Sequence, residues 1–272
     1  MISDEDTLDS QSLIYQAQNH TLPALQYMDD ATQKWIAKNE PRYDVVSRLN
    51  FDLQSYTDWT SHFPLRRDWF PEPRLADTVH GLRHLLRTAY FACCLAKEKE
   101  LGRTQTIFVF MAAQLHDIRR QDDRGDPGHA QRSADWFIAN APTVAKQWRL
   151  KLTDEYCMAI AAVISLHETP YGDFGREQRV LYERHQVAVD ILKTADALDR
   201  YRLPKLKWWI NDEYLNLVPS SAMKQLAFNL VVRSERYFLE GVGNERSVNR
   251  AIHNVVGLRK ERANLWREVH TR

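Results

Sequence analysis

The sequence of 272 residues is poor in glycine and cysteine, with 9 and 3 of them, respectively. So few glycines leave little material for phosphate-binding loops, and we find no Walker motif, glycine-rich dinucleotide turn or serine-nucleophile elbow. Two of the cysteines are neighbours and the total is odd, so the paired disulfide framework of a small secreted protein is excluded. We interpret all three cysteines as buried thiols.

Neither sign of charge dominates, because 37 lysines and arginines face 36 aspartates and glutamates, a formal net charge of +1. A protein that coats nucleic acid would need a strong positive charge, so we expect no dedicated nucleic-acid binding. The longest apolar runs fall far short of the roughly 18 residues that a membrane span needs, and the acidic start does not resemble a signal peptide. We therefore expect a cytoplasmic protein with no membrane partner. The sequence leaves its oligomeric state open.

Alternating β-branched segments bounded by turns are also nearly absent, whereas apolar residues at helical spacing recur along the chain. The sequence therefore predicts an all-α fold, with a loop over the turn-rich residues 122–128. Two helices are expected early, around Leu22–Ile36 and Val45–Leu53. The later predicted helices are Leu75–Glu98, Thr104–His116, His129–Asn140, Asp154–His167, Gln178–Tyr201, Ser220–Glu240 and Ser247–His270.

No internal repeat and no long linker divides the chain, so one domain with an appended segment is the simplest partition. The prolines Pro64, Pro71 and Pro73 mark the expected seam. We predict an N-terminal helical segment over residues 1–63 that packs on the core, and a main domain over residues 64–272 that ends in a helical extension.

Histidines and aspartates recur at the ends and on the faces of the predicted helices. The pair His116-Asp117 ends a helix whose preceding residues are nearly all apolar, so these two polar groups need partners in the core. Imidazole and carboxylate are ligands of transition metals, and a metal centre gathers several of them from separate elements. The candidates are His80, His84, His116, Asp117, His129, His167 and Asp196.

The order of His84, then His116-Asp117, then Asp196 resembles the HD-domain superfamily, which is named for its adjacent His-Asp pair. The matching local sequences are His84-Leu-Leu-Arg87, Leu115-His-Asp-Ile118 and Ala195-Asp-Ala-Leu-Asp199. The resemblance spans Asp77 to Arg202, near half of the chain. It implies that the main domain is an HD-domain helical bundle built around one or two metal ions.

The resemblance also implies a role for each candidate ligand. The four residues of the ordered pattern would hold a first metal ion, and the Asp117 carboxylate would bridge to a second. His129 and His167 resemble the two additional histidines of binuclear members. The pattern favours two ions over one, and it leaves their identity open among Mn, Fe, Ni, Zn, Co and Mg.

Further residues are expected to contact the substrate or assist the reaction. His80 precedes His84 by one predicted helical turn, where some binuclear relatives carry a carboxylate, and we assign it a catalytic role beside Asp117. Cations near the ligands would neutralise a bound anion, and Lys193 is expected to serve in both catalysis and binding. The expected substrate-binding residues are Arg119, Arg120, Arg124, Tyr171, Lys193 and Arg200.

Two bridged metal ions about 3.5–4 Å apart can hold a hydroxide and polarise a phosphoryl oxygen. We therefore expect a metal-dependent phosphohydrolase whose partner is a small phosphorylated substrate, either a nucleotide or another phosphate ester. Two alternatives stay open. One is an HD-type di-iron oxygenase resembling myo-inositol oxygenase, which also uses four histidines and two aspartates, and the other is a non-catalytic HD binding module.

Overall fold

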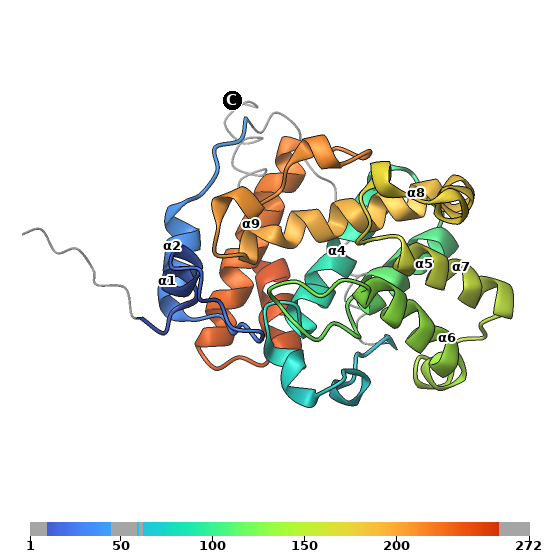
Figure 1. Cartoon of the computed structure of the whole chain (residues 1–272), viewed down its shortest axis with the longest axis horizontal. Coiled ribbons are helices and arrows are strands. Elements are labelled where there is room, and N and C mark those ends of the chain that lie inside the picture. Colours follow the sequence, from blue (N-terminus) through green and yellow to red (C-terminus); the bar gives the residue numbers. More distant parts are fainter. Residues whose placement is uncertain (1–9, 45–58, 60–61, 256–272) are drawn as a thin grey trace, which may run out of the picture.

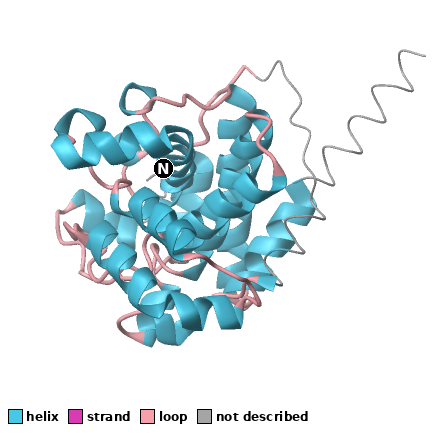
Figure 2. Cartoon of the chain, turned by 90° about the vertical axis from the view of Figure 1, so that its right-hand side faces the viewer, coloured by secondary structure: helices cyan, strands magenta, loops and turns pink. Residues whose placement is uncertain are grey.

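The part of the chain that the computed structural model describes, residues 10–44, 59 and 62–255, consists of helices joined by loops and contains no strand (Figure 2). The predicted all-α fold is confirmed. None of the helices in these ranges combines the length and the apolar character needed to traverse a membrane.

Two short helices, α1 (Leu13–Gln18) and α2 (Asp30–Lys38), lie at one end of the molecule (Figure 1). Asp29 caps α2 and also accepts a hydrogen bond from the backbone N–H of Leu13 at 2.8 Å, which joins the two helices. The prediction of one helix from Leu22 to Ile36 is wrong in its first half. Residues 21–29 have no helix, because their backbone bonds to other parts of the chain.

The predicted helix at Val45–Leu53 lies outside the described residues.

Five central helices pack against one another in the middle of the molecule. Helix α4 packs against α5 and α8, and α7 packs against α5, α6 and α8 (Figure 1). They are α4 (Leu82–Glu98), α5 (Arg103–Leu115), α6 (His129–Gln147), α7 (Asp154–Ser165) and α8 (Arg176–Leu198).

The chain returns to its N-terminal helices through α9 (Ser221–Leu239), which packs on α2 and on a 3-10 helix after α8. A further helix begins at residue 244 and is described as far as residue 255, so the predicted helix at Ser247–His270 is partly outside the described residues. The 3-10 helices are η1 (Arg67–Trp69), η2 (Pro73–Asp77), η3 (Tyr171–Asp173), η4 (Asp199–Arg202), η5 (Leu206–Trp208) and η6 (Asp212–Tyr214).

The predicted long helix at Leu75–Glu98 begins only at Leu82, after η2 and a tight turn. This turn requires a glycine at position 81, because a Cβ atom on Gly81 would lie 2.4 Å from the carbonyl oxygen of Ala76. His80 therefore lies outside α4, and its predicted place one helical turn before His84 is wrong. The two rings are still neighbours, with centroids 5.7 Å apart.

The ends of the central helices decide where the polar candidates lie. α5 ends at Leu115, directly before His116, and α7 ends two residues before His167. α6 begins at His129 and runs past its predicted end at Asn140, with Pro142 inside the helix. Because these helices start or stop in the same region, the side chains at their ends can meet.

Candidate metal centre

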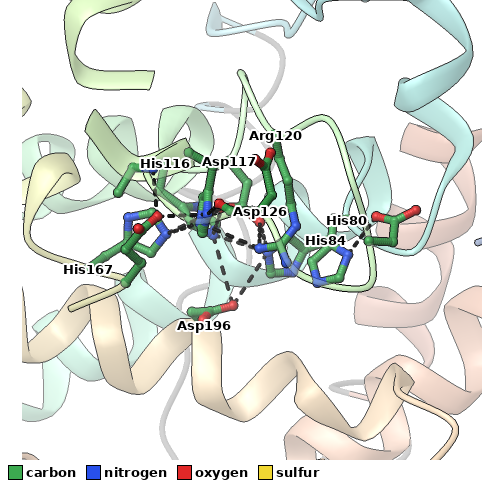
Figure 3. A network of polar contacts seen from close by, with 12 residues as sticks. His80, His84, His116, Asp117, Arg120, Asp126, His167 and Asp196 are labelled. Atoms are coloured by element: carbon green, nitrogen blue, oxygen red, sulfur yellow. Dashed lines mark hydrogen bonds and ion pairs between the residues drawn. The ribbon is translucent and has the colours of Figure 1, made fainter. Parts of the chain in front are cut away.

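Four histidines and two aspartates from five separate parts of the chain meet where the central helices α4 to α8 pack together. In Figure 3, His84, His116, Asp117, His167 and Asp196 turn toward one another, and His80 lies to one side. The structure thus brings together all of the predicted ligands, which are His84, His116, Asp117, His129, His167 and Asp196.

The first half of the cluster lies where α4, α5 and α8 meet. The Nε2 atom of His84 is 3.0 Å from the Nε2 atom of His116, 3.4 Å from Oδ1 of Asp196 and 3.6 Å from Oδ2 of Asp117. The ring of His84 has no exposed surface, whereas 28% of the Asp196 side chain is exposed. This half therefore opens toward solvent on the side of Asp196.

The second half joins the start of α6 to the end of α7. The Nε2 atoms of His129 and His167 are 3.1 Å apart, and both face Oδ1 of Asp117, at 2.9 and 3.3 Å. Asp117 consequently belongs to both triads, His84–His116–Asp117 and Asp117–His129–His167, and each triad could hold a metal ion.

Each of the four imidazoles has an acceptor at its Nδ1 atom. His84 donates to the Asp199 carboxylate at 2.8 Å. The other three rings donate to backbone carbonyls at 2.7 Å: His116 to Ala113, His129 to Asp126, and His167 to Ile164. A carbonyl or carboxylate oxygen only accepts, so Nδ1 carries the proton and Nε2 offers its lone pair. This is the form in which histidine ligates metals.

These orientations leave two pairs of nitrogen lone pairs facing each other, His84 with His116 and His129 with His167. Such pairs repel unless a proton or a metal ion lies between them. Two nitrogen ligands held at about 2.1 Å from one ion, at a right angle, are about 3.0 Å apart. The observed separations of 3.0 and 3.1 Å match that spacing, so the donor set fits a metal ion.

Burial and mutual charge shape the protonation of the cluster. Burial lowers the pKa of His116 to about 3, which keeps this imidazole neutral at physiological pH. Burial works against ionisation of Asp117, but the neighbouring His129, His116 and Arg120 together hold its pKa well below the usual value. Burial lowers the pKa of His129 and the Asp117 carboxylate raises it, with a net upward shift, so a metal ion there would compete with a proton.

Only one of the predicted substrate-binding arginines reaches the cluster. The Nη1 atom of Arg120 is 3.5 Å from Oδ2 of Asp117 and 3.4 Å from Nε2 of His129. The other three are not brought to it. Arg119 donates to the carbonyl of Trp69 at 2.9 Å, Arg200 donates to the carbonyl of Trp208 at 2.5 Å, and Arg124 pairs with Asp122 on the surface.

Lys193 points at the backbone beside the cluster. Its ammonium donates to the carbonyls of Leu166, His167 and Thr169 at 3.2, 2.8 and 2.6 Å, which occupies all three of its hydrogens. Burial lowers its pKa to about 8. Tyr171 lies with its ring 4.8 Å from this ammonium, and its hydroxyl donates to Asp190. Lys193 therefore fixes the segment that carries His167.

His80 forms a separate dyad next to the first half of the cluster. Its Nδ1 atom is 2.7 Å from Oδ1 of Asp123, and both side chains are buried. Burial, together with the charges of Arg120 and Arg202, lowers the pKa of His80 well below its usual value. The His80 ring packs against that of His84, with centroids 5.7 Å apart, and belongs to neither triad.

The sequence prediction missed three carboxylates that support the cluster. Asp123 holds His80, Asp199 holds His84, and Glu168 lies 2.7 Å from Nδ1 of His129. Glu168 also accepts from two backbone N–H groups at the start of α6, at 2.6 and 2.9 Å. Two of the three had a local signal, because Asp199 follows Asp196 by about one turn and Glu168 directly follows His167.

No protein-family model matches this chain, and neither the curated proteins nor the solved structures contain a match to it.

Proposed function

We propose that the chain is a metal-dependent phosphohydrolase that acts on a nucleotide or another small phosphate ester, as the resemblance to the HD-domain superfamily implies. The observation that carries the proposal is the pair of buried triads that share the Asp117 carboxylate. Two neighbouring metal ions can clamp the attacking and leaving oxygens of a displacement at phosphorus, and a carboxylate shared by two histidine pairs could hold such ions.

When bound, such ions would lower the pKa of a coordinated water and polarise a phosphoryl oxygen. His84, His116 and Asp196 would hold one ion, His129 and His167 the other, and Asp117 both. Asp196 is the most exposed of these ligands, so substrate would approach on its side.

Arg120 is the cation best placed to bind the phosphoryl group. Its guanidinium lies beside Oδ2 of Asp117, and its contacts with Asp122 and His129 are long, at 3.3 and 3.4 Å. A guanidinium that is weakly held by protein groups can form stronger charge-assisted hydrogen bonds with a phosphate. Arg120 therefore recognises the substrate, and Lys193 contributes by holding the His167 segment.

One observation favours a second candidate, a di-iron oxygenase of the kind that resembles myo-inositol oxygenase. Of the five cations expected to bind a phosphate, four bond to other protein groups and only Arg120 lies at the ligands. An oxygenase with a neutral substrate would need few cations. Imidazole and carboxylate ligands suit iron as well as manganese or zinc.

Metal analysis of protein purified without chelator, combined with a substrate screen, separates the two candidates. The screen measures phosphate release from mono-, di- and triphosphates with several divalent metals, and oxygen uptake by the iron-loaded protein. We expect phosphate release that is lost on chelation and on Arg120→Met, with Arg124→Met as the matched control. Oxygen uptake without phosphate release from any ester would instead support the oxygenase.

A further inference from the structure

Asp199 is a fully buried carboxylate that contacts a metal-ligand candidate but belongs to neither triad. Its Oδ2 atom accepts a hydrogen bond from Nδ1 of His84 at 2.8 Å. His116, His129 and His167 each have a backbone carbonyl at the corresponding atom. His129 also has the Glu168 carboxylate 2.7 Å from this atom, whereas His84 has no backbone carbonyl there and is oriented by side chains alone.

Two arginines hold the Asp199 carboxylate in place. Arg87 donates to both of its oxygens, at 2.5 and 3.0 Å, and Nη1 of Arg202 lies 3.3 Å from Oδ2. Arg87 is itself fixed, because it donates to Glu235 on α9 at 2.6 Å. Burial opposes ionisation, but Arg87, the bond from His84 and Arg202 keep the pKa of Asp199 far below its usual value, so the carboxylate is charged.

We propose that Asp199 is a positioning residue that orients the His84 imidazole and strengthens it as a ligand, and so sets the metal affinity of the first triad. The inference rests on the metal site of the proposed function. A histidine that donates to a carboxylate is held in one tautomer and one ring orientation, and its other nitrogen becomes more basic.

The surroundings of His84 contain no equal substitute for this carboxylate. Without Asp199, the remaining neighbour of Nδ1 is the hydroxyl of Thr88, at 3.3 Å. A hydroxyl carries no charge, and at this distance the bond is weak. Loss of the carboxylate should therefore reduce metal affinity at this triad about 10- to 100-fold, the usual effect of removing such a partner.

Titration with Co²⁺, followed by its visible absorption, tests this without any substrate. A His167→Ala background removes the second triad, so the spectrum reports the first triad alone. We expect Asp199→Asn to weaken Co²⁺ binding about 10- to 100-fold. The matched control is Glu235→Gln, which disturbs the same buried ion network but touches no histidine. It should lower thermal stability while leaving Co²⁺ affinity within about threefold of the parent.

A double variant, Arg87→Met with Asp199→Leu, decides the matter if Asp199→Asn does not fold. It replaces the two most closely bonded members of the buried ion network with apolar side chains, so that neither Arg87 nor Asp199 is left as an unpaired charge and Glu235 keeps Arg83, but it still deprives His84 of its acceptor. Folded protein with weak Co²⁺ binding supports the inference. Parental Co²⁺ affinity in either Asp199 variant, or an equal loss in Glu235→Gln, would overturn it while leaving the proposed function intact. If the unmutated protein binds no Co²⁺, the inference about Asp199 and the proposed function both fail.

Discussion

At the scale of single residues, the centre depends on where each imidazole proton is held. Backbone carbonyls accept from three of the rings, with the Glu168 carboxylate also beside His129, and Asp199 accepts from the fourth, so the Nε2 atoms of all four face Asp117 and one another. Nε2 lone pairs that face one another in a buried space repel unless a proton or a metal ion lies between them. The orientation of the rings is therefore the strongest physical reason to expect a cation at the cluster.

Asp117→Ala tests the shared carboxylate. Because Asp117 faces both histidine pairs, its loss should abolish turnover and leave the fold largely intact, with some loss of stability. Steady-state turnover at saturating metal and circular dichroism measure the two effects. Near-native turnover in this variant would mean that Asp117 is not the bridge.

The dyad of His80 and Asp123 predicts a pH dependence of stability. Burial raises the pKa of Asp123 from 3.8 to about 6. The folded state therefore keeps a proton on Asp123 that the unfolded chain releases near pH 4, so the contribution of this group to stability is lost as the pH rises from about 4 to about 6, by about 1.4 kcal/mol per unit of pKa difference.

Asp123→Asn removes this titration. Its stability relative to the wild type should rise across the same pH window and then level off. Urea denaturation of both proteins at pH 4, 5, 6 and 7, without metal, measures the difference. A stability difference that does not change with pH would contradict the assignment of the raised pKa.

At the scale of helices, the chemistry lies at helix ends, and sequence patterns predict helices better than side-chain directions. His116-Asp117 stood out because an apolar helix ends in two polar groups, and the pair is indeed buried. Arg119 follows the pair after Ile118, yet its side chain donates to the carbonyl of Trp69 and not to the cluster. Its neighbour Arg120 lies beside Asp117 instead. Adjacent residues in a turn point in different directions, and residue spacing in the sequence does not show which of them faces the cluster.

The partners of buried charges are equally hard to read from the sequence. Arg87 lies in α4, and its acceptors Asp199 and Glu235 lie more than 100 residues away in η4 and α9. Periodicity identifies a buried face, but it does not say which charged residue on that face meets which other one. Asp199 was missed for this reason, although it stands one turn from a predicted ligand.

Lys193→Met tests the role of the lysine that holds the end of α7. Three carbonyls lose their donor, so the free energy of unfolding should fall by about 1–3 kcal/mol. Metal affinity at the triad with His167 should fall as well. Urea denaturation measures the free energy of unfolding, and Co²⁺ titration measures the metal affinity.

Lys224→Met is the matched control, since Lys224 pairs with the partly exposed Asp212 and should contribute less than about 1 kcal/mol. A Lys193→Met protein of unchanged stability and metal affinity, but with a raised KM, would return Lys193 to the substrate-binding role predicted from the sequence.

At the scale of the whole molecule, distant segments close the structure around the cluster. The backbone of Gln26 accepts from Val79 at 2.9 Å and donates to the Asp123 carboxylate at 2.7 Å. It thereby fastens the turn before α4 to the loop before α6, and α2 packs on α9 farther away. The all-α class followed from periodicity, whereas these long-range contacts leave no periodic trace in the sequence.

Removal of metal should lower the stability of the whole chain. An ion that binds the folded state alone adds about 2.7 kcal/mol when its free concentration is 100 times Kd. We therefore expect a chelator to lower Tm and added metal to restore it. Asp117→Ala should show little of this response, and an equal response in that variant would place the stabilising ion elsewhere.

The most direct test of the central claim is anomalous diffraction from crystals of the chain loaded with manganese, recorded near the manganese absorption edge. We predict two peaks about 3.5–4 Å apart, one on either side of the Asp117 carboxylate. One should lie beside His84 and His116, the other beside His129 and His167. Diffraction that shows no peak within bonding distance of these histidines would contradict the metal centre and the function built on it.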